Sequence, residues 1–305
     1  MSKKAMKTLI RFCKLNTMAP AVSSTDREKI NGQVIEILEN EDVNRNLLNR
    51  RGKFSIPLCE ACRSGNEEII AILLQYRADP NVYDKNKCTP LYIASSLGYR
   101  GIVEKLLETN ADVNAKNEQG YVPLLSAIEN NHFEIAEILM EHGADVNIKR
   151  PNTFGIEMTL MTFVLFAKNN IPLAEKLLEA GVNPHVFEKP LNFILLEYGD
   201  ECRRFIKKLV YAGYSFYCDA WVRLVKSKLD SGNKDQVTES ELEMLEFLNQ
   251  EHYNACSLQK TCRTVIRTCL SGSRPRDHIS SKISCLPLPT NIKRYLALEF
   301  ALSGF

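Results

Sequence analysis

Long apolar runs are missing from this 305-residue chain. No run approaches the roughly 20 consecutive apolar residues that a membrane-spanning helix requires. A strong net charge is also missing, because 39 Lys and Arg residues face 37 Asp and Glu residues and leave a net charge of +2. The sequence therefore predicts neither a membrane nor a nucleic acid as a partner, and any basic surface that binds a partner must be local.

Motifs for enzyme chemistry are missing as well. The sequence contains no Gly-rich phosphate loop, no nucleophile elbow and no H-E-x-x-H motif. Its Asp and Glu residues fall mostly on the predicted solvent faces of helices. We therefore expect a non-catalytic protein without a cofactor or a metal ion.

The ten cysteines are scattered, and the chain has no secretory signal. This usage is typical of reduced thiols in a cytoplasmic or nuclear protein. Cys59 and Cys62 form one C-x2-C pair, but no second pair at the spacing of a zinc site accompanies them. We interpret both as small buried thiols on a helix.

The N-terminal stretch is basic, and no acidic residue precedes Asp26. It lacks an apolar core as long as that of a secretory signal. Acid-poor amphipathic stretches also occur in mitochondrial targeting signals, which is the alternative for this segment. We predict a solvated basic tail over residues 1–29.

A 33-residue repeat organises the middle of the chain, and three markers recur in one phase. The motif A-D-x-N occurs at 78–81, 111–114 and 144–147. The motif P-L-x-x-A follows residue 56, 89 and 122. An apolar pair occurs at Leu73-Leu74, Leu106-Leu107 and Leu139-Met140. Such self-similarity predicts a stack of short supersecondary units.

One unit shows what the markers do. Thr89 is a natural helix cap, Pro90 suits a first helical turn, and Gly98 ends the helix. The second helix carries an apolar stripe at helical spacing: Ile102, Val103, Leu106 and Leu107. A single unit cannot bury these faces alone, so neighbouring units must stack.

A 33-residue step with T-P-L-x-x-A resembles ankyrin repeats between about residues 50 and 148. The resemblance implies an all-α solenoid. The apolar pair returns at Leu177-Leu178 after a longer step, which predicts an insertion near residues 151–155, and again at Leu209-Val210.

The outer units are degenerate, as terminal repeats often are. Residues 34–44 look like the back half of a leading unit. We therefore expect about six units over residues 30–216. Residues 217–255 follow as a helical connector that covers the last repeat, with Thr238 and Glu241 as a capping box.

Ankyrin stacks usually bind partners through their hairpin tips and their inner helix face. The resemblance therefore implies a protein substrate at the tips, whose candidate residues are Lys85, Asn86, Lys87, Asn117, Glu118, Lys149 and Arg150. The alternative for each is a solvated loop residue. Lys87 stands where the ankyrin pattern often has Gly, so we expect that tip to be distorted.

The C-terminal part begins with a predicted helix capped by Ser257. Three of its residues fall at i, i+4 and i+8 on one face: Leu258, Cys262 and Ile266. Arg263 and Arg267 fall on the other face. The alternative is that the apolar face packs on the rest of the chain.

After a loop, the two prolines of Leu286, Pro287, Leu288 and Pro289 exclude a helix or an interior strand, so this segment is extended. Helical spacing resumes over residues 291–300. The order of these parts resembles a SOCS box over residues 256–302. Together with the repeats, it is similar to the ankyrin repeat and SOCS box family.

This family resemblance implies the partners. Leu258, Cys262 and Ile266 would enter a groove of elongin C, which is itself paired with elongin B. Leu286, Pro287, Leu288 and Pro289 would favour a type-five cullin with its RING partner.

Two functions follow. The first is a substrate receptor of a cullin-RING ubiquitin ligase, which promotes substrate ubiquitination and proteasomal degradation. The second is a plain ankyrin scaffold without ubiquitin chemistry. Co-purification of elongin B/C distinguishes them.

Overall fold

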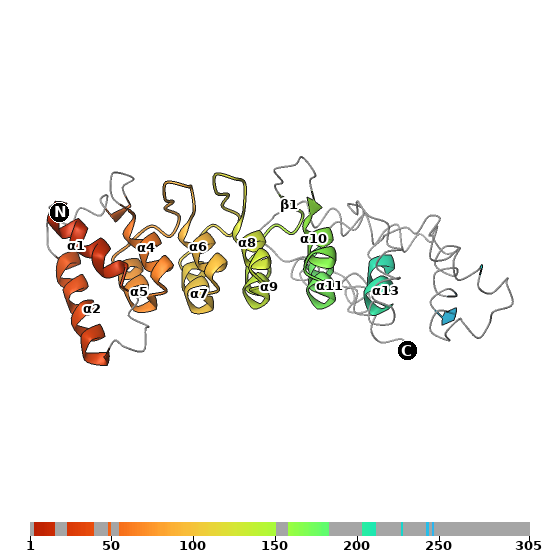
Figure 1. Cartoon of the computed structure of the whole chain (residues 1–305), viewed down its shortest axis with the longest axis horizontal. Coiled ribbons are helices and arrows are strands. Elements are labelled where there is room, and N and C mark those ends of the chain that lie inside the picture. The colour runs from red at the N-terminus through yellow and green to blue at the C-terminus, as the bar shows by residue number, and fades with distance from the viewer. Residues whose placement is uncertain are drawn as a thin grey trace, which may run out of the picture. The chain divides into compact units, whose positions relative to one another are not determined.

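The computed structural model describes residues 3–15, 23–39, 48–49, 55–150, 158–182 and 203–211, with the single positions 227, 242, 243 and 246. The regular elements of this part of the chain are helices, apart from one two-stranded sheet (Figure 1). The predicted all-α architecture is confirmed. The chain divides into a first unit, residues 1–144, and a second unit, residues 145–305.

Helices of the first unit form successive pairs. Their bounds are α1 (Lys3–Cys13), α2 (Ser24–Glu39), α4 (Pro57–Ser64), α5 (Glu67–Gln75), α6 (Pro90–Leu97), α7 (Arg100–Glu108), α8 (Pro123–Glu129) and α9 (Phe133–Glu141). First helices pack on first helices, as α4 does on α6 and α6 on α8, whereas α5 packs on α7 and α7 on α9. Figure 1 shows these pairs side by side, with the connecting loops on one side. This is the stack that the 33-residue step predicts.

The α6 helix begins and ends where the sequence predicts. Thr89 Oγ1 accepts a hydrogen bond from Tyr92 N at 3.2 Å, and Pro90 occupies the first turn. Gly98 ends the helix in the left-handed region with φ 82°. A Cβ atom there would lie 2.5 Å from the ring of His132, which begins the second helix of the next pair. Gly98 therefore serves both the turn and the close approach of the next unit.

The apolar stripe of α7 is narrower than predicted. Ile102, Val103 and Leu106 are fully buried, but Leu107 is only partly buried. Leu106 lies about one turn from both Ile102 and Val103, so the three side chains share one side of the helix. Leu107 lies at the edge of that side.

The loops between pairs share one hydrogen-bond pattern. Asp84 Oδ1 accepts hydrogen bonds from Asn86 N and Cys88 N, each at 2.9 Å. Asn117 stands 33 residues later, and its Oδ1 accepts two equivalent bonds at 3.0 and 2.9 Å. Short polar side chains that bond to the backbone two residues on are typical turn formers. The two hairpin tips therefore have the same conformation.

Lys87 adopts the conformation that the next tip gives to glycine. Its φ is 56°, and Gly120 at the equivalent position has φ 84°. Lys87 N donates to Asp84 O at 3.0 Å, and Gly120 N donates to Asn117 O at 3.1 Å. The expected distortion of the first tip is therefore wrong. The loop keeps its geometry, and the residue bears a cost of about 1–2 kcal/mol instead.

The expectation of a solvated N-terminal tail is wrong for residues 3–13, which form α1. This helix packs on α4 and on α2. Its buried side chains are Met6, Leu9, Ile10 and Cys13. They recur at helical spacing between the basic residues, and an apolar stripe of this kind must be buried. The apolar spacing of this segment therefore decides its structure more than its basic charge does.

The leading unit is a whole helix pair rather than the back half of one. The α2 helix begins at Ser24 and packs on α5. Tyr76 Oη donates a hydrogen bond to Glu39 Oε1 at 3.0 Å, and this bond raises the pKa of Tyr76. Asn31 Nδ2 donates to the carboxylate of Glu68. These two contacts hold α2 against α5 and against Tyr76, which directly follows α5.

The interpretation of Cys59 and Cys62 as buried thiols on a helix is confirmed. Both lie on α4 with no exposed surface, and Cys13 of α1 is equally buried. Burial raises the pKa of Cys13 and that of Cys59 to about 12, and raises the pKa of Cys62 well above its usual value. Because the thiolate is the nucleophile, these thiols are unreactive while α1 stays packed.

The second unit contains β1 (Lys149–Arg150), β2 (Met158–Thr159), α10 (Leu160–Phe166), α11 (Ile171–Ala180) and α13 (Arg203–Tyr211). The two strands are antiparallel, with Lys149 opposite Thr159. They flank the insertion expected near residues 151–155. Thr159 Oγ1 then caps α10 by accepting a hydrogen bond from Thr162 N at 3.3 Å.

A buried lysine joins α11 and α13. Lys208 has 1% of its surface exposed, and its Nζ lies 2.8 Å from Glu175 Oε2 and 2.7 Å from Glu179 Oε1. A buried ammonium needs such partners because burial without them is costly. These two ion pairs hold α13 against α11.

Within the described ranges, the structure contains no helix with the length and apolarity to span a membrane.

Replacing Leu9 with Ala tests the packing of α1. Because Leu9 is fully buried, Leu9→Ala should lower the free energy of unfolding by about 2–5 kcal/mol in urea titrations. It should also speed alkylation of Cys13 in the native protein. Arg11→Ala on the exposed side is the control and should change stability by less than about 0.5 kcal/mol. Equal stability of both variants would mean that α1 is a tail.

The two hairpin tips offer a matched pair of substitutions. Lys87→Gly should raise the free energy of unfolding by about 0.5–1 kcal/mol, because relief of the left-handed strain exceeds the entropy cost of glycine. Gly120→Ala should lower it by about 1 kcal/mol for the opposite reason. Thermal and urea unfolding measure both. A less stable Lys87→Gly variant would contradict the assignment of strain.

Candidate protein-interaction sites

The hairpin tips of the first unit are joined to one another. Glu118 N donates a hydrogen bond to Asn86 O at 3.1 Å, which links the second tip to the first. At the base of the loops, Asn81 Oδ1 accepts from Asp112 N at 2.7 Å, and Asn81 Nδ2 donates to Asn110 O at 3.2 Å. The tips therefore form a fixed row rather than separate loops. A preorganised surface loses less entropy when a partner binds.

Four of the predicted tip residues are exposed on this row, namely Lys85, Asn86, Lys87 and Glu118. Asn117 was also a candidate, but it is only 8% exposed. Its side chain is used inside its own hairpin, where it accepts the two backbone bonds described above. Its role as a partner contact stays a prediction, and the structure shows that its side chain also serves the turn.

The remaining candidates, Lys149 and Arg150, belong to the second unit. Lys149 is exposed, whereas Arg150 is partly buried. The guanidinium carbon of Arg150 lies 4.8 Å from the ring centroid of Phe163, and Lys168 Nζ lies 5.7 Å from the same centroid. Cations at these distances are attracted to the face of an aromatic ring. Arg150 therefore has a structural contact in addition to any role with a partner.

A row of ion pairs near the first tip was missed by the sequence analysis. Arg63 of α4 donates to Glu60 Oε1 at 2.8 Å and pairs with the Asp84 carboxylate of the hairpin. Lys14 Nζ lies 3.9 Å from Glu60 Oε2. The spacing of Glu60 and Arg63 suggests their own contact, since residues three apart are neighbours on a helix. Nothing in the sequence indicates that Asp84 and Lys14 join them.

The inner helix face adds neutral polar groups. Tyr92 of α6 and Cys88 of the first hairpin are both partly buried. Burial raises the pKa of each, and a hydrogen bond with Ser126 partly opposes the shift of Tyr92. Both side chains are therefore protonated at neutral pH and can exchange hydrogen bonds with a partner. In the part of the chain that the structure describes, no group of three or more His, Cys, Asp and Glu residues is arranged to hold a metal ion.

The predicted C-terminal anchors lie outside the described residues. These are Leu258, Cys262 and Ile266 for elongin C, and Leu286, Pro287, Leu288 and Pro289 for the cullin. Their roles remain predictions from the sequence.

Comparison with protein families identifies both parts of the chain. The family described as "Ankyrin repeats (3 copies)" matches residues 27–117 and, in an overlapping match, residues 58–150. The family described as "SOCS box" matches residues 254–297. A comparison with curated proteins finds no match. The ankyrin match begins within α2, so it includes α2 and leaves α1 outside.

These matches confirm the predicted architecture of ankyrin repeats followed by a SOCS box. Ankyrin repeats are protein-interaction modules. A SOCS box indicates an adaptor that binds elongin B/C and a cullin-RING ubiquitin ligase, and proteins with this pair of modules are non-catalytic. The chain belongs to the ankyrin repeat and SOCS box family.

Proposed function

We propose that this protein is a substrate receptor, which holds a protein substrate on its ankyrin surface and presents it to a cullin-RING ubiquitin ligase for ubiquitination and proteasomal degradation. The observation that supports this best is the SOCS box at residues 254–297, which follows the ankyrin repeats and contains both predicted anchor segments in order. A plain ankyrin scaffold, the alternative function, does not account for that module.

The elongin-binding half of the proposal rests on helix geometry. Leu258, Cys262 and Ile266 are spaced by four residues, so a helix would place them on one face. An amphipathic helix can lay such a face into a groove of a partner. We infer that Leu258 fills the main pocket of elongin C, and that Cys262 suits a tighter pocket because a thiol is small and apolar.

The cullin-binding half rests on chain stiffness. In Leu286–Pro289, two prolines fix their own backbone angles and leave Leu286 and Leu288 on an extended segment. A segment that is already extended binds with little loss of conformational entropy. We propose that it selects a type-five cullin with its RING partner, in the cytoplasm or the nucleus.

The ankyrin surface supplies proximity rather than chemistry. The exposed tip residues Lys85, Asn86, Lys87 and Glu118 lie on the hydrogen-bonded row of hairpins, and this row is the proposed substrate site of the first unit. Lys149 and Arg150 are the proposed contacts of the second unit. Binding raises the local concentration of substrate at a conjugating enzyme on the RING partner. Substrate lysines are then modified by that enzyme, and this chain takes no part in the bond changes.

Introducing negative charge on the apolar face tests the elongin contact. The double variant Leu258→Asp,Cys262→Asp should abolish co-purification of elongin B/C, because two carboxylates cannot be buried in an apolar groove without large cost. Proteins captured by the ankyrin surface should also show longer half-lives in cells that express this variant. The measurements are affinity purification and cycloheximide chase.

The matched control is Arg263→Asp,Arg267→Asp, which places two carboxylates on the opposite face of the same predicted helix. It should retain elongin B/C. Loss of elongin in both double variants, or in neither, would argue against the proposed anchor face. A melting curve of each variant separates lost binding from lost folding.

The extended segment has a separate test. Leu286→Ala,Leu288→Ala keeps both prolines and removes the displayed side chains, so it should weaken capture of the type-five cullin by at least about tenfold and leave elongin B/C bound. Quantitative pull-down with purified cullin measures the loss. If another cullin is captured more tightly than the type-five cullin, the assignment of cullin type is wrong.

A further inference from the structure

The exposed side of α1 carries a basic stripe. Lys7, Arg11 and Lys14 are spaced at i, i+4 and i+7, and all three are exposed. Residues at this spacing lie above one another on a helix. The helix is held in place through its opposite, apolar side, so the stripe has a fixed position on the first unit.

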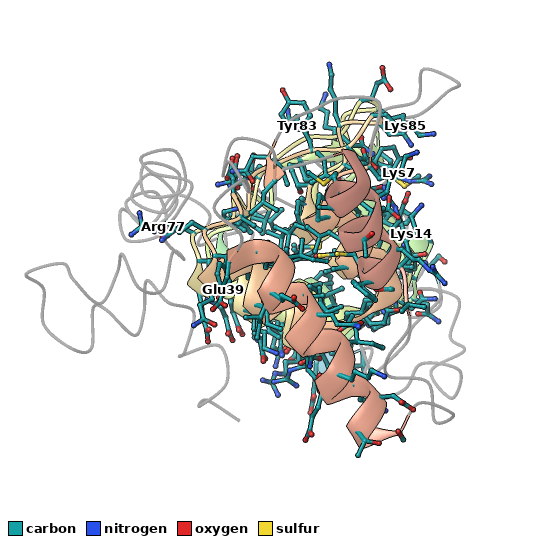
Figure 2. The ribbon with its side chains drawn as sticks, turned by 90° about the vertical axis from the view of Figure 1, so that its left-hand side faces the viewer. Lys7, Lys14, Glu39, Arg77, Tyr83 and Lys85 are labelled. Carbon is teal, nitrogen blue, oxygen red and sulfur yellow. The ribbon has the colours of Figure 1, made fainter. Side chains whose placement is uncertain are left out.

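A series of ion pairs connects this stripe to the first hairpin tip. Lys14 pairs with Glu60 of α4, Glu60 pairs with Arg63, and Arg63 pairs with Asp84 at the tip. Lys85 follows Asp84 directly. Figure 2 shows Lys7 and Lys14 on the same side of the first unit as Lys85. We call the surface formed by Lys7, Arg11, Lys14, Arg63 and Lys85 the basic face.

The carboxylates within the basic face lie beneath its cations. The side chains of Lys14 and Arg63 are 56% and 39% exposed, whereas those of Glu60 and Asp84 are 12% and 8% exposed. The carboxylates therefore orient the cations, and little of their own surface is open to a partner. Among the residues that the structure describes, no carboxylate pairs with Lys7, Arg11 or Lys85. Solvent thus meets a positive surface on a chain that is almost neutral.

We propose that the basic face binds an acidic segment of the substrate protein, rich in Asp and Glu. This inference rests on the proposed function, because it names the class of substrate for the same receptor. A guanidinium group such as that of Arg11 binds a carboxylate through paired hydrogen bonds. Several carboxylates on one flexible segment can engage the stripe and the tip together, each pair adding a small gain.

A protein segment fits this surface better than a nucleic acid does. The basic face ends at the second hairpin tip, where exposed Glu118 is held next to Asn86 of the first tip by a backbone hydrogen bond. A nucleic acid carries a phosphate at every nucleotide and would meet that carboxylate. A peptide can place its acidic residues only where the cations lie.

The test measures binding of a fluorescent peptide of alternating Glu and Ser to the full chain by anisotropy. The wild type should bind it, with an affinity that falls as salt is added, because exposed charge pairs are screened over about 8 Å at physiological ionic strength. Lys7→Glu,Lys85→Glu should weaken binding by at least about tenfold. A peptide with Gln in place of Glu should not bind.

The control is Lys29→Glu,Arg77→Glu, which makes the same change in net charge at two exposed residues. Figure 2 shows Arg77 on the side opposite to Lys7 and Lys85. This control should change affinity by less than about twofold. Equal weakening by the two double variants would overturn the proposal. So would binding of the Gln peptide, or tighter binding of a single-stranded oligonucleotide or of phosphatidylserine vesicles than of the Glu peptide.

Two further measurements keep the outcomes separate. Lys7→Gln,Lys85→Gln removes the charges without reversing them, and it replaces the first variant if that variant melts at a lower temperature. Peptide binding is measured with and without elongin B/C, and Lys7→Glu,Lys85→Glu should still co-purify elongin B/C. If elongin B/C does not co-purify with the wild type, the ligase assignment is wrong. Peptide binding then tests the basic face independently of that assignment.

Discussion

The constraint on which the structure depends is that no single helix pair can bury its own apolar face. Leu91 and Ala94 of α6 are fully buried only because α4 and α8 lie on either side. The same requirement acts at the start of the stack, where α4 and α5 need a neighbour. The basic N-terminal segment and α2 provide it, and three buried thiols mark the covered surface. A solenoid of this kind is stabilised by nearest-neighbour contacts along its length.

Hydrogen bonds within and between the hairpin loops hold the loops of the stack in place. Asp84 and Asn117 hold their own hairpins, and Asn81 ties one loop to the next. These bonds involve backbone groups that would otherwise need water or another partner. Because they fix the loops, the exposed tip side chains are displayed in one arrangement. A protein-interaction surface benefits from such rigidity, since less entropy is lost on binding.

In the proposed function the chemistry of ubiquitin transfer lies outside this chain, so its parts are judged by what they bind. The SOCS box connects the chain to elongin B/C and a cullin-RING ligase, and the ankyrin repeats supply the protein-binding surface. The charge distribution of the ankyrin surface then favours an acidic segment as the proposed partner. The chain as a whole carries almost no net charge, yet the basic face is positive because Lys7, Arg11 and Lys85 have no carboxylate partner among the described residues.

The repeat is predictable from the sequence, because period, caps and apolar spacing are local properties. Thr89, Pro90 and Gly98 act as predicted, and the SOCS box follows from the order of its anchors. Tertiary structure alone decided how segments far apart in the chain meet. Burial of α1, the pairing of Lys208 and the ion pairs of Arg63 with Asp84 depend on which helices are neighbours. A sequence states that a residue is charged or apolar, but only the packed chain decides which side chain faces it and whether water reaches it.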